Sequence, residues 1–418
     1  MTTALHFLLA AKRCEIDGLR ELALTSEGAD LAAQLIHGLQ RERGLSNLWL
    51  GSGGGRGGDA RLAQLADNDA SEAAWRAHVQ RLDTAGLSGP HGARLFSRLA
   101  LALQGLDALR PLRAQVQALA LDPPAATAAF SRVIAALLAV VFEAADSASD
   151  PDLSRRLVAL FHFMQGKEFA GQERAAGSAL FASGRADPVG QQRLLHLIDS
   201  QERSLEAFGA FADEETRAVW AQAESGAPLA RLERLRRLLA TAGGGAPLDA
   251  ELSPAWFETC SQRMDRMRTV EARLAGALRA ACAARLAAVN DEALSYERLA
   301  ATGTPPADPL SFFRDAPAPD GVDNAGRGGP LQDSVLALAQ DQARRLQAMG
   351  EELAAVRASL NERKLIERAK GLLMAHRGLS EADAHKTLRQ MAMNQNRRLI
   401  DVAEAVLAMA DVLTPGPR

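Results

Sequence analysis

Aromatic residues and cysteines are scarce in this sequence, and each shortage excludes a class of structure. Phe, Trp and Tyr make up only 4% of the 418 residues, whereas apolar residues together reach 47%. Because strands favour aromatic and β-branched side chains, a chain dominated by Ala and Leu is expected to fold as packed helices. The three cysteines, Cys14, Cys260 and Cys282, are too scattered for a disulfide framework or a metal-binding pair. This usage is typical of a cytoplasmic protein.

Motifs for metal binding and catalysis are also missing. The eight histidines are dispersed without a His-x-x-x-His pair, so neither a metal site nor a cofactor is expected. The glycine-rich stretch SGGGRGG (52–58) lacks the Gly-Lys-Ser/Thr ending of a phosphate loop, and no serine occupies a nucleophile elbow. The longest apolar run, VIAALLAVVF (133–142), is about half of a membrane span. We therefore expect neither an enzyme nor a membrane protein.

Charge is nearly balanced overall but uneven along the chain. The net charge is −3, yet residues 361–418 carry ten Lys or Arg against seven Asp or Glu, which gives +3 and leaves −6 for residues 1–360. Three of the five lysines of the chain lie in that tail. A basic surplus confined to one end predicts a distinct C-terminal module.

Helical periodicity covers most of residues 3–300, with breaks at stretches rich in Gly and Pro. The spacing of these breaks predicts helices of roughly 25–30 residues, the length found in long bundles. Residues 301–330 are rich in Pro, Gly, Ala and Asp, a composition typical of a linker. The predicted organisation is a helical domain at 1–300, the linker at 301–330, a connecting helix at 331–360 and a three-helix bundle at 361–418.

The connecting helix contains a short heptad pattern, which consists of Leu346, Met349, Leu353, Val356 and Leu360. This spacing suits a coiled-coil seam, and therefore a homodimer. It suits equally well an amphipathic helix that lies on the rest of the same chain. The sequence leaves both interpretations open.

A charged dipeptide is repeated within the helical domain. Glu42-Arg43 in QRERGLSNLWLGSG and Glu173-Arg174 in GQERAAGSALFASG lie 131 residues apart (174 − 43), and each is followed by Ser-Gly at the same distance. The repeat predicts two similar helices that each present one arginine at a matching place. Arginine is a planar, permanent cation that suits flat oxyanions. The two arginines could converge on a ligand between two bundles, or each could simply pair with a nearby carboxylate.

The segments around these arginines resemble the NIT domain, the nitrate- and nitrite-sensing domain of bacterial regulators. LQRERGLSNLWLGSG resembles its first signature, GQERAAGSALFASG its second, and WFETCSQRMDRMRTVEARL (256–274) its closing segment. The resemblance covers residues 34–280 and implies an all-helical fold. It further implies two four-helix bundles that hold nitrate between them with arginines.

The resemblance also indicates which arginines would bind the ligand. Arg43 matches the first arginine of the family and Arg174 the second. A third is expected within RLERLRRLL (231–239), where Arg236 is the choice. The alternatives at this place are Arg231, Arg234 and Arg237.

The stretch ERKLIERAKGLLMAHRGLSEADAHKTLRQMAMNQNRRLIDVAEAVL (362–407) closely resembles an ANTAR domain. The resemblance implies a small helical module that binds RNA hairpins in mRNA leaders and prevents transcription termination. The candidate RNA-binding residues are Arg363, Lys364, Arg368, Lys370, Arg389, Arg397 and Arg398. They could instead form an ordinary solvated basic surface. Because residues 361–418 contain no Phe, Tyr or Trp, stacking on loop bases would require arginine or His385.

Together the two resemblances imply a one-component cytoplasmic regulator. Nitrate or nitrite would act as its effector, and leader mRNA hairpins of a nitrate assimilation operon would be its target. Further expected partners are a second copy of the chain and, indirectly, the transcription elongation complex. Two alternatives stay open: a sensor of another small anion with the same RNA output, and a signal-dependent protein-interaction module without specific RNA binding.

Overall fold

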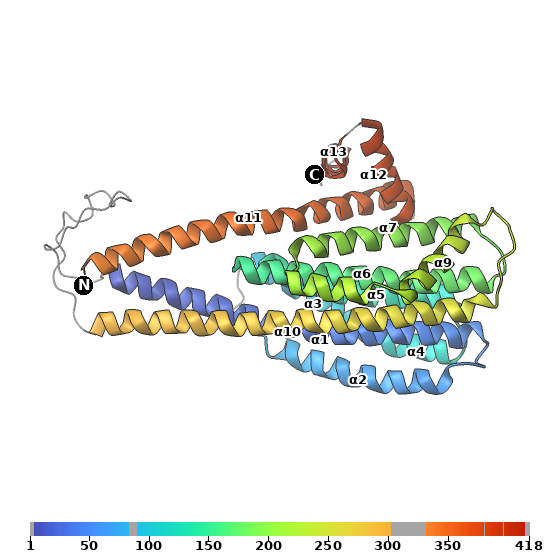
Figure 1. Ribbon diagram of the computed structural model, residues 1–418, viewed down its shortest axis with the longest axis horizontal. Helices are drawn as coiled ribbons and strands as arrows, with labels where there is room; N and C mark the ends of the chain where they lie inside the picture. The colour runs from blue at the N-terminus through green and yellow to red at the C-terminus, as the bar shows by residue number, and fades with distance from the viewer. Residues whose placement is uncertain (1–3, 83–89, 302–331, 380, 396, 414–418) are drawn as a thin grey trace.

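The computed structural model describes residues 4–82, 90–301, 332–379, 381–395 and 397–413, and these are mostly helical (Figure 1). Within these ranges no β-strand is present, and the expected all-α fold is confirmed. Apart from Ala301, the linker expected at 301–330 lies outside the described residues.

The described helices that precede the linker form two halves. The first half contains α1 (Ala4–Gly51), α2 (Gly58–Gln80), α3 (Pro90–Asp107), α4 (Leu109–Gln117) and α5 (Pro123–Ser147). The second half contains α6 (Pro151–Ala182), α7 (Pro188–Phe211), α8 (Glu214–Ala223), α9 (Ala227–Thr241) and α10 (Leu252–Ala301). In the first half α1 packs on α2 and α5, and in the second α6 packs on α7 and α10. The paired bundles implied by the sequence are therefore present.

Three helix starts follow directly from an Asp-Pro pair in the sequence. Asp122, Asp150 and Asp187 cap α5, α6 and α7, and each side chain accepts a hydrogen bond from a backbone N–H of the first turn. The proline that follows fits the first helical position, since the missing N–H would have no partner there. These caps fix where α5 and α6 begin, and thereby how the two halves meet.

The helices α1 and α10 are longer than the sequence breaks predicted. They have 48 and 50 residues, because no proline interrupts α1 and α10 contains one only at its third position. The two run antiparallel, since Lys12 pairs with Glu292 at 2.6 Å and Asp30 with Arg279 at 2.7 Å. These two ion pairs join α10 of the second half to α1 of the first half.

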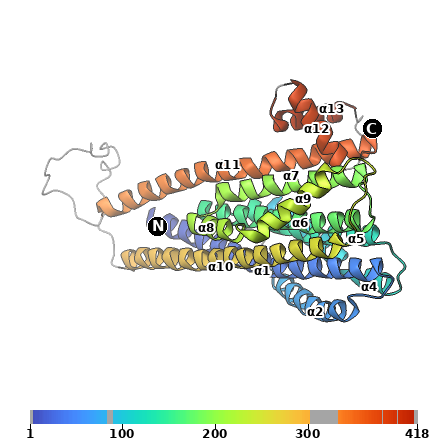
Figure 2. The same cartoon turned by 45° about the vertical axis from the view of Figure 1, so that its right-hand side comes forward.

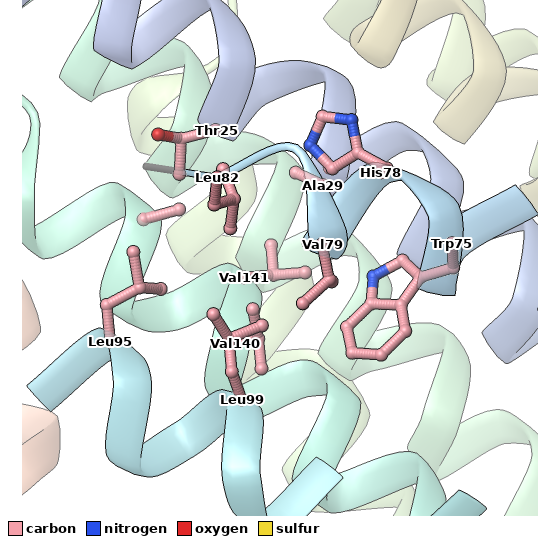
Figure 3. Close-up of a pocket in the computed structure, with 12 residues that line it drawn as sticks. Thr25, Ala29, Trp75, His78, Val79, Leu82, Leu95, Leu99, Val140 and Val141 are labelled. Atoms are coloured by element: carbon pink, nitrogen blue, oxygen red, sulfur yellow. The ribbon is translucent and has the colours of Figure 1, made fainter. Parts of the chain in front are cut away.

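The helix α5 is apolar and long enough to cross a membrane by composition alone. In the structure its apolar face belongs to the core, because Phe130, Ile134, Leu137 and Val141 are at most 1% exposed. The spacing of these residues is that of one helix face. Beside this face, a cavity of about 20 Å³ lies among α1, α2, α3 and α5 (Figure 3), which is room for roughly one water molecule.

The C-terminal bundle consists of the end of α11 (Gln332–Arg377) together with α12 (Glu381–Gln395) and α13 (Leu399–Leu413). It stands at one end of the long helix α11 (Figure 2). α11 stops before Gly378, whose φ of 63° is the left-handed conformation expected after a helix. The buried core of this bundle consists of Ala369, Leu373, Ala384, Leu388, Ala392, Val402, Ala403 and Val406.

The helix α11 lies along the two-bundle domain, on the side opposite α2 (Figures 1 and 2). Val356 and Leu360 of the heptad pattern are buried in the main core, whereas Leu346 is 54% exposed. The interpretation as an amphipathic helix lying on its own chain therefore holds for the second part of the pattern.

Candidate functional site

Arg43 on α1 and Arg174 on α6 are both buried, with exposures of 1% and 4%. α10 packs antiparallel against both of these helices. Lys12 and Asp30 of α1 pair with Glu292 and Arg279, and on α6 Lys167 pairs with Glu271 while the backbone oxygen of Arg174 accepts from Trp256. The two arginines are close enough that the charge of one affects the pKa of the other. The repeated Glu-Arg dipeptide thus occurs on two equivalent, buried helices.

Arg43 is neutralised by a carboxylate of the other half. Its Nη1 donates to Glu168 Oε1 at 2.6 Å and its Nη2 to Glu168 Oε2 at 3.2 Å. Nη1 also donates to the hydroxyl of Ser131 on α5 at 2.7 Å. Gln40 and Gln172 donate to the same carboxylate, at 3.0 and 2.9 Å. This part of the site matches the alternative in which the arginine pairs with a nearby carboxylate.

Arg174 has no carboxylate within ion-pair distance among the residues that the structure describes. Its Nη1 donates to Ser261 Oγ at 2.9 Å and its Nη2 to the backbone oxygen of Gln40 at 2.8 Å. The guanidinium also lies 4.8 Å from the ring centre of Phe257, a favourable cation–π arrangement. Burial, and then the positive charge of Arg43, lower the pKa of Arg174 to about 10. It remains a cation at neutral pH.

Two glycines allow the arginines to approach the opposite helix. A Cβ atom on Gly171 of α6 would lie closer than 3.0 Å to Nη2 of Arg43, and one on Gly44 of α1 would lie 2.6 Å from Nη2 of Arg174. Glycine inside a helix costs about 0.5–1 kcal/mol relative to alanine. Its use at both positions is explained by the space that the guanidinium groups occupy.

The carboxylate beside each arginine in the sequence is held within its own half. Glu42 accepts from Nε and Nη2 of Arg113 on α4, both at 2.8 Å, and from the amide of Asn68 on α2 at 2.6 Å.

In the second half, Glu173 accepts from Nε and Nη2 of Arg236 on α9, both at 2.7 Å, and from the amide of Gln201 on α7 at 2.5 Å. The two sets match group for group. The two halves are therefore related by an approximate internal symmetry that extends to the polar contacts.

This arrangement gives Arg236 a carboxylate partner in its own half. It is buried, and its guanidinium also pairs with Glu233 at 2.7 Å. Burial alone would lower its pKa, but the carboxylate of Glu173 more than offsets this effect and raises the pKa. Arg236 is therefore a paired cation, as Arg43 is, and it holds Glu173, the neighbour of Arg174 in the sequence.

The closing segment of the two-bundle domain is anchored by a tryptophan. Trp256 on α10 is fully buried, and its Nε1 donates to the backbone oxygen of Arg174 at 3.0 Å. A Cβ atom on Gly177 of α6 would overlap the indole ring, so only glycine fits there. This contact sets the register of α10 on α6 and thereby positions Phe257 and Ser261 beside Arg174.

The site has the chemistry of an oxyanion receptor. It contains a buried guanidinium that lacks a carboxylate, and buried unpaired charge is strongly unfavourable until a counter-ion arrives. Within the described chain, Nε of Arg43 and the hydroxyl of Ser46 one turn further are buried without a hydrogen-bond partner. A planar anion could accept from donors of this kind. By contrast, the cavity near Trp75 and His78 is lined mainly by apolar side chains (Figure 3).

Two of the candidate RNA-binding cations contact the two-bundle domain. Lys364 on α11 donates to Asp146 at the end of α5 at 2.7 Å and lies 5.2 Å from the ring centre of Phe142. Arg389 on α12 lies 3.6 Å from Asp199 on α7. Asp146 and Asp199 of the two-bundle domain therefore form ion pairs with Lys364 and Arg389, which would otherwise be available to phosphates.

The remaining candidates differ in exposure. Arg368, Arg397 and Arg398 are exposed, and Arg398 pairs with Asp401 at 3.1 Å. Lys370 is buried and pairs with Glu367 at 3.0 Å, so it is not a surface cation in this structure. The side chain of Arg363 lies outside the described residues.

The contact between α12 and α7 also covers His385, the residue considered for base stacking. It is 7% exposed, and its ring centre lies 5.3 Å from that of His196 on α7. Burial, followed by the charges of Arg203, His196 and Lys370, lowers the pKa of His385 to about 4. The ring is neutral at neutral pH and faces the first domain.

Several residues of the site were not identified from the sequence. Ser131 and Ser261 carry no local signal, because serine is common on helices and only packing brings these two to the arginines. Gly44 and Gly171 did carry a signal, since both lie within the quoted motifs and an isolated glycine inside a helical pattern often marks a close approach. Glu168 could have been identified only from the structure.

Comparison with known proteins identifies the families of both parts of the chain. Residues 34–279 match the NIT family, described as nitrate and nitrite sensing, and residues 354–407 match the ANTAR domain. The nitrate regulatory protein of Klebsiella oxytoca is 35% identical over 399 residues, which cover 96% of this chain and 93% of that protein.

Two further similarities concern the C-terminal module and the whole fold. The transcriptional regulatory protein PdtaR of Mycobacterium tuberculosis is 40% identical over 73 residues, which are 18% of this chain and 36% of that protein. The solved structure of the NasR transcription antiterminator superposes with a TM-score of 0.62 at 32% identity, covering 96% of this chain and 98% of that one. The chain therefore belongs to the NIT family of nitrate- and nitrite-sensing proteins, and its C-terminal bundle is an ANTAR domain.

Proposed function

We propose that the chain is a one-component antitermination regulator that responds to nitrate or nitrite. The NIT domain senses the anion, and the ANTAR domain binds hairpins in a leader mRNA and disfavours the terminator, with nitrate assimilation genes as the target. The protein acts in the cytoplasm on nascent RNA and thus contacts the elongation complex only indirectly.

Arg174 is the primary ligand-binding residue in this proposal. Its guanidinium is buried without a carboxylate, and the hydroxyl of Ser261 and the ring of Phe257 hold it in place. Nitrate is a flat and very weakly basic anion, so its recognition requires fixed donors rather than a proton-transfer group. Arg43 contributes from the opposite half, and Arg236 supports the site by fixing Glu173.

The observation that carries the proposal is the contact between Lys364 of the ANTAR domain and Asp146 of the NIT domain. A cation expected to bind RNA is held by a carboxylate of the sensor, so this form has reduced access to phosphates. Ligand binding would favour a second form in which the ANTAR domain is released. Such a shift requires a differential affinity, and a hundredfold preference for the released form corresponds to about 2.7 kcal/mol.

A titration of a two-hairpin leader RNA, with nitrate or with chloride at equal ionic strength, tests this switch. The unmodified chain is expected to bind the RNA tightly only with nitrate. Arg174→Ala should not respond to nitrate, because it removes the uncompensated cation. Asp146→Asn should bind the RNA without nitrate, since Lys364 loses its partner. Asp17→Asn, at an exposed aspartate that pairs with Arg20, is the charge-matched control and should behave as the unmodified chain.

Each alternative gives a different result in the same titration. Equal RNA binding with and without nitrate would contradict the switch. A response to another anion but not to nitrate would indicate a sensor of that anion with the same output. Binding that is weak, steeply salt-dependent and indifferent to sequence would favour a protein-interaction module.

We also propose a homodimer. The first part of the heptad pattern remains available for it, since Leu346 is 54% exposed whereas Val356 and Leu360 pack on the same chain. Exposed apolar side chains in heptad register are suited to a second copy of the helix.

A further inference from the structure

The internal symmetry of the NIT domain is broken at one position beside the arginines. Subtracting the repeat distance of 131 from 168 gives 37, so the counterpart of Glu168 in the first half is His37. The carboxylate of Glu168 forms an ion pair with Arg43 and accepts its hydrogen bonds. At the matching place beside Arg174 the chain has an imidazole in place of a carboxylate.

His37 does not supply a compensating charge. Burial and the nearby cations Lys167, Arg268, Arg41 and Arg174 lower its pKa to about 2, so the ring is neutral at neutral pH. Among the described residues, its Nδ1 is buried without a hydrogen-bond partner. Arg174 is therefore flanked by a neutral group where Arg43 is flanked by a carboxylate.

The other buried cations around the site are paired. Lys167 and Glu271 are both fully buried and form an ion pair, to which the partly exposed Arg268 adds a contact at 3.1 Å. Arg113 is paired with Glu42, and Arg236 with Glu173. Arg61 on α2 is also buried without a carboxylate, but it lies inside the first half, where it donates to Gln117. Among the described residues of α1, α6 and α10, Arg174 is the one buried cation without a carboxylate.

We propose that Glu168 is a specificity-determining residue of the anion site. By neutralising Arg43 it leaves a single uncompensated guanidinium, and a site with one surplus positive charge takes a monovalent anion and rejects a divalent one. The reason is electrostatic, since a dianion in a buried site would leave one negative charge unpaired. This inference rests on the proposed function, because it concerns the same site.

Calorimetric titration of the full chain with nitrate and with sulfate, at constant ionic strength, tests the assignment. The unmodified chain is expected to bind nitrate and to reject sulfate. Glu168→Gln keeps the size of the side chain and one of its two acceptor oxygens, and it raises the surplus charge from one to two. Its sulfate affinity should rise at least about tenfold, the factor that roughly 1.4 kcal/mol of added attraction produces.

Two further sets of variants test whether the effect of Glu168→Gln comes from the charge at this site. Glu202→Gln makes the same charge change at an exposed position on α7 and should bind both anions as the unmodified chain does. His37→Glu adds a carboxylate where the symmetry predicts it and should bind nitrate at least about tenfold more weakly than the neutral variant His37→Gln. Because this change adds a carboxylate among cations, it creates no unpaired charge and tests the idea even if Glu168→Gln does not fold.

The possible failures can be distinguished. An unmodified chain that binds no nitrate would overturn the proposed function itself. If the unmodified chain binds nitrate and Glu168→Gln gains no sulfate affinity, Glu168 only supports Arg43 and the assignment is wrong, even if nitrate binding improves. Equal nitrate binding by His37→Glu and His37→Gln would also overturn it.

Discussion

Replacing Gly171 by alanine should damage the site even though alanine is the better helix former. Gly171 lies inside α6, where Gly→Ala normally stabilises a helix by about 0.5–1 kcal/mol. Here the new Cβ would lie closer than 3.0 Å to Nη2 of Arg43 and 3.1 Å from Cε of Met264. Both groups are buried, so relief requires moving a guanidinium that Glu168 and Ser131 fix.

The change in the free energy of unfolding caused by Gly171→Ala is the difference between the overpacking cost and the gain in helix propensity. Overpacking in a dense interior costs about 1–3 kcal/mol, and loss of one partner of a buried ion pair costs about 3–5 kcal/mol. Because Arg43 is displaced rather than removed, the lower range applies, and after the helix gain the net loss of stability is up to about 2.5 kcal/mol. Nitrate affinity should fall at least about tenfold, since the displaced guanidinium no longer faces the site.

Urea denaturation followed by circular dichroism, together with calorimetric nitrate titration, measures both effects. Gly276→Ala on α10 is the control, because nothing lies within 4 Å of a Cβ atom at that position; it should stabilise by about 0.5–1 kcal/mol and leave nitrate binding unchanged. The reasoning would be refuted if Gly171→Ala were as stable as Gly276→Ala and bound nitrate as the unmodified chain does.

Two further predictions concern the ANTAR domain and the oligomer. Because the pKa of His385 is about 4 when it faces His196, Arg203, Lys370 and Asp199 and near 6.5 when released, docking is fully favourable above pH 6.5 and weakens as the pH falls toward 4. RNA binding without nitrate should therefore rise between pH 7.5 and 5.5, and a rise of the same size in His385→Gln would show that another group is responsible. Leu346→Glu should shift sedimentation equilibrium from dimer to monomer, and an unchanged mass would exclude this seam.

Much of the fold was predictable because its signals are local. The scarcity of aromatic residues and the helical periodicity predict an all-α chain, and the Asp-Pro pairs that cap α5, α6 and α7 depend only on neighbouring residues. The helices α1 and α10 exceed the predicted 25–30 residues, because no stretch rich in Gly and Pro interrupts either of them. The heptad pattern was ambiguous because the spacing of apolar residues does not show whether they pack on the same chain or on a second copy.

The equivalence of Arg43 and Arg174 could be predicted from the sequence, because a repeated Glu-Arg dipeptide at a fixed spacing is visible without knowledge of any contact. The difference between their environments depends on packing, since Arg43 pairs with a carboxylate and Arg174 does not. Glu168 lies 125 residues from Arg43 in the sequence, and Asp146 lies 218 residues from Lys364; no local rule links such pairs. Whether a buried cation is paired depends on which side chains other helices bring to it, and the packing of α1, α6 and α10 pairs Arg43 and leaves Arg174 without a carboxylate.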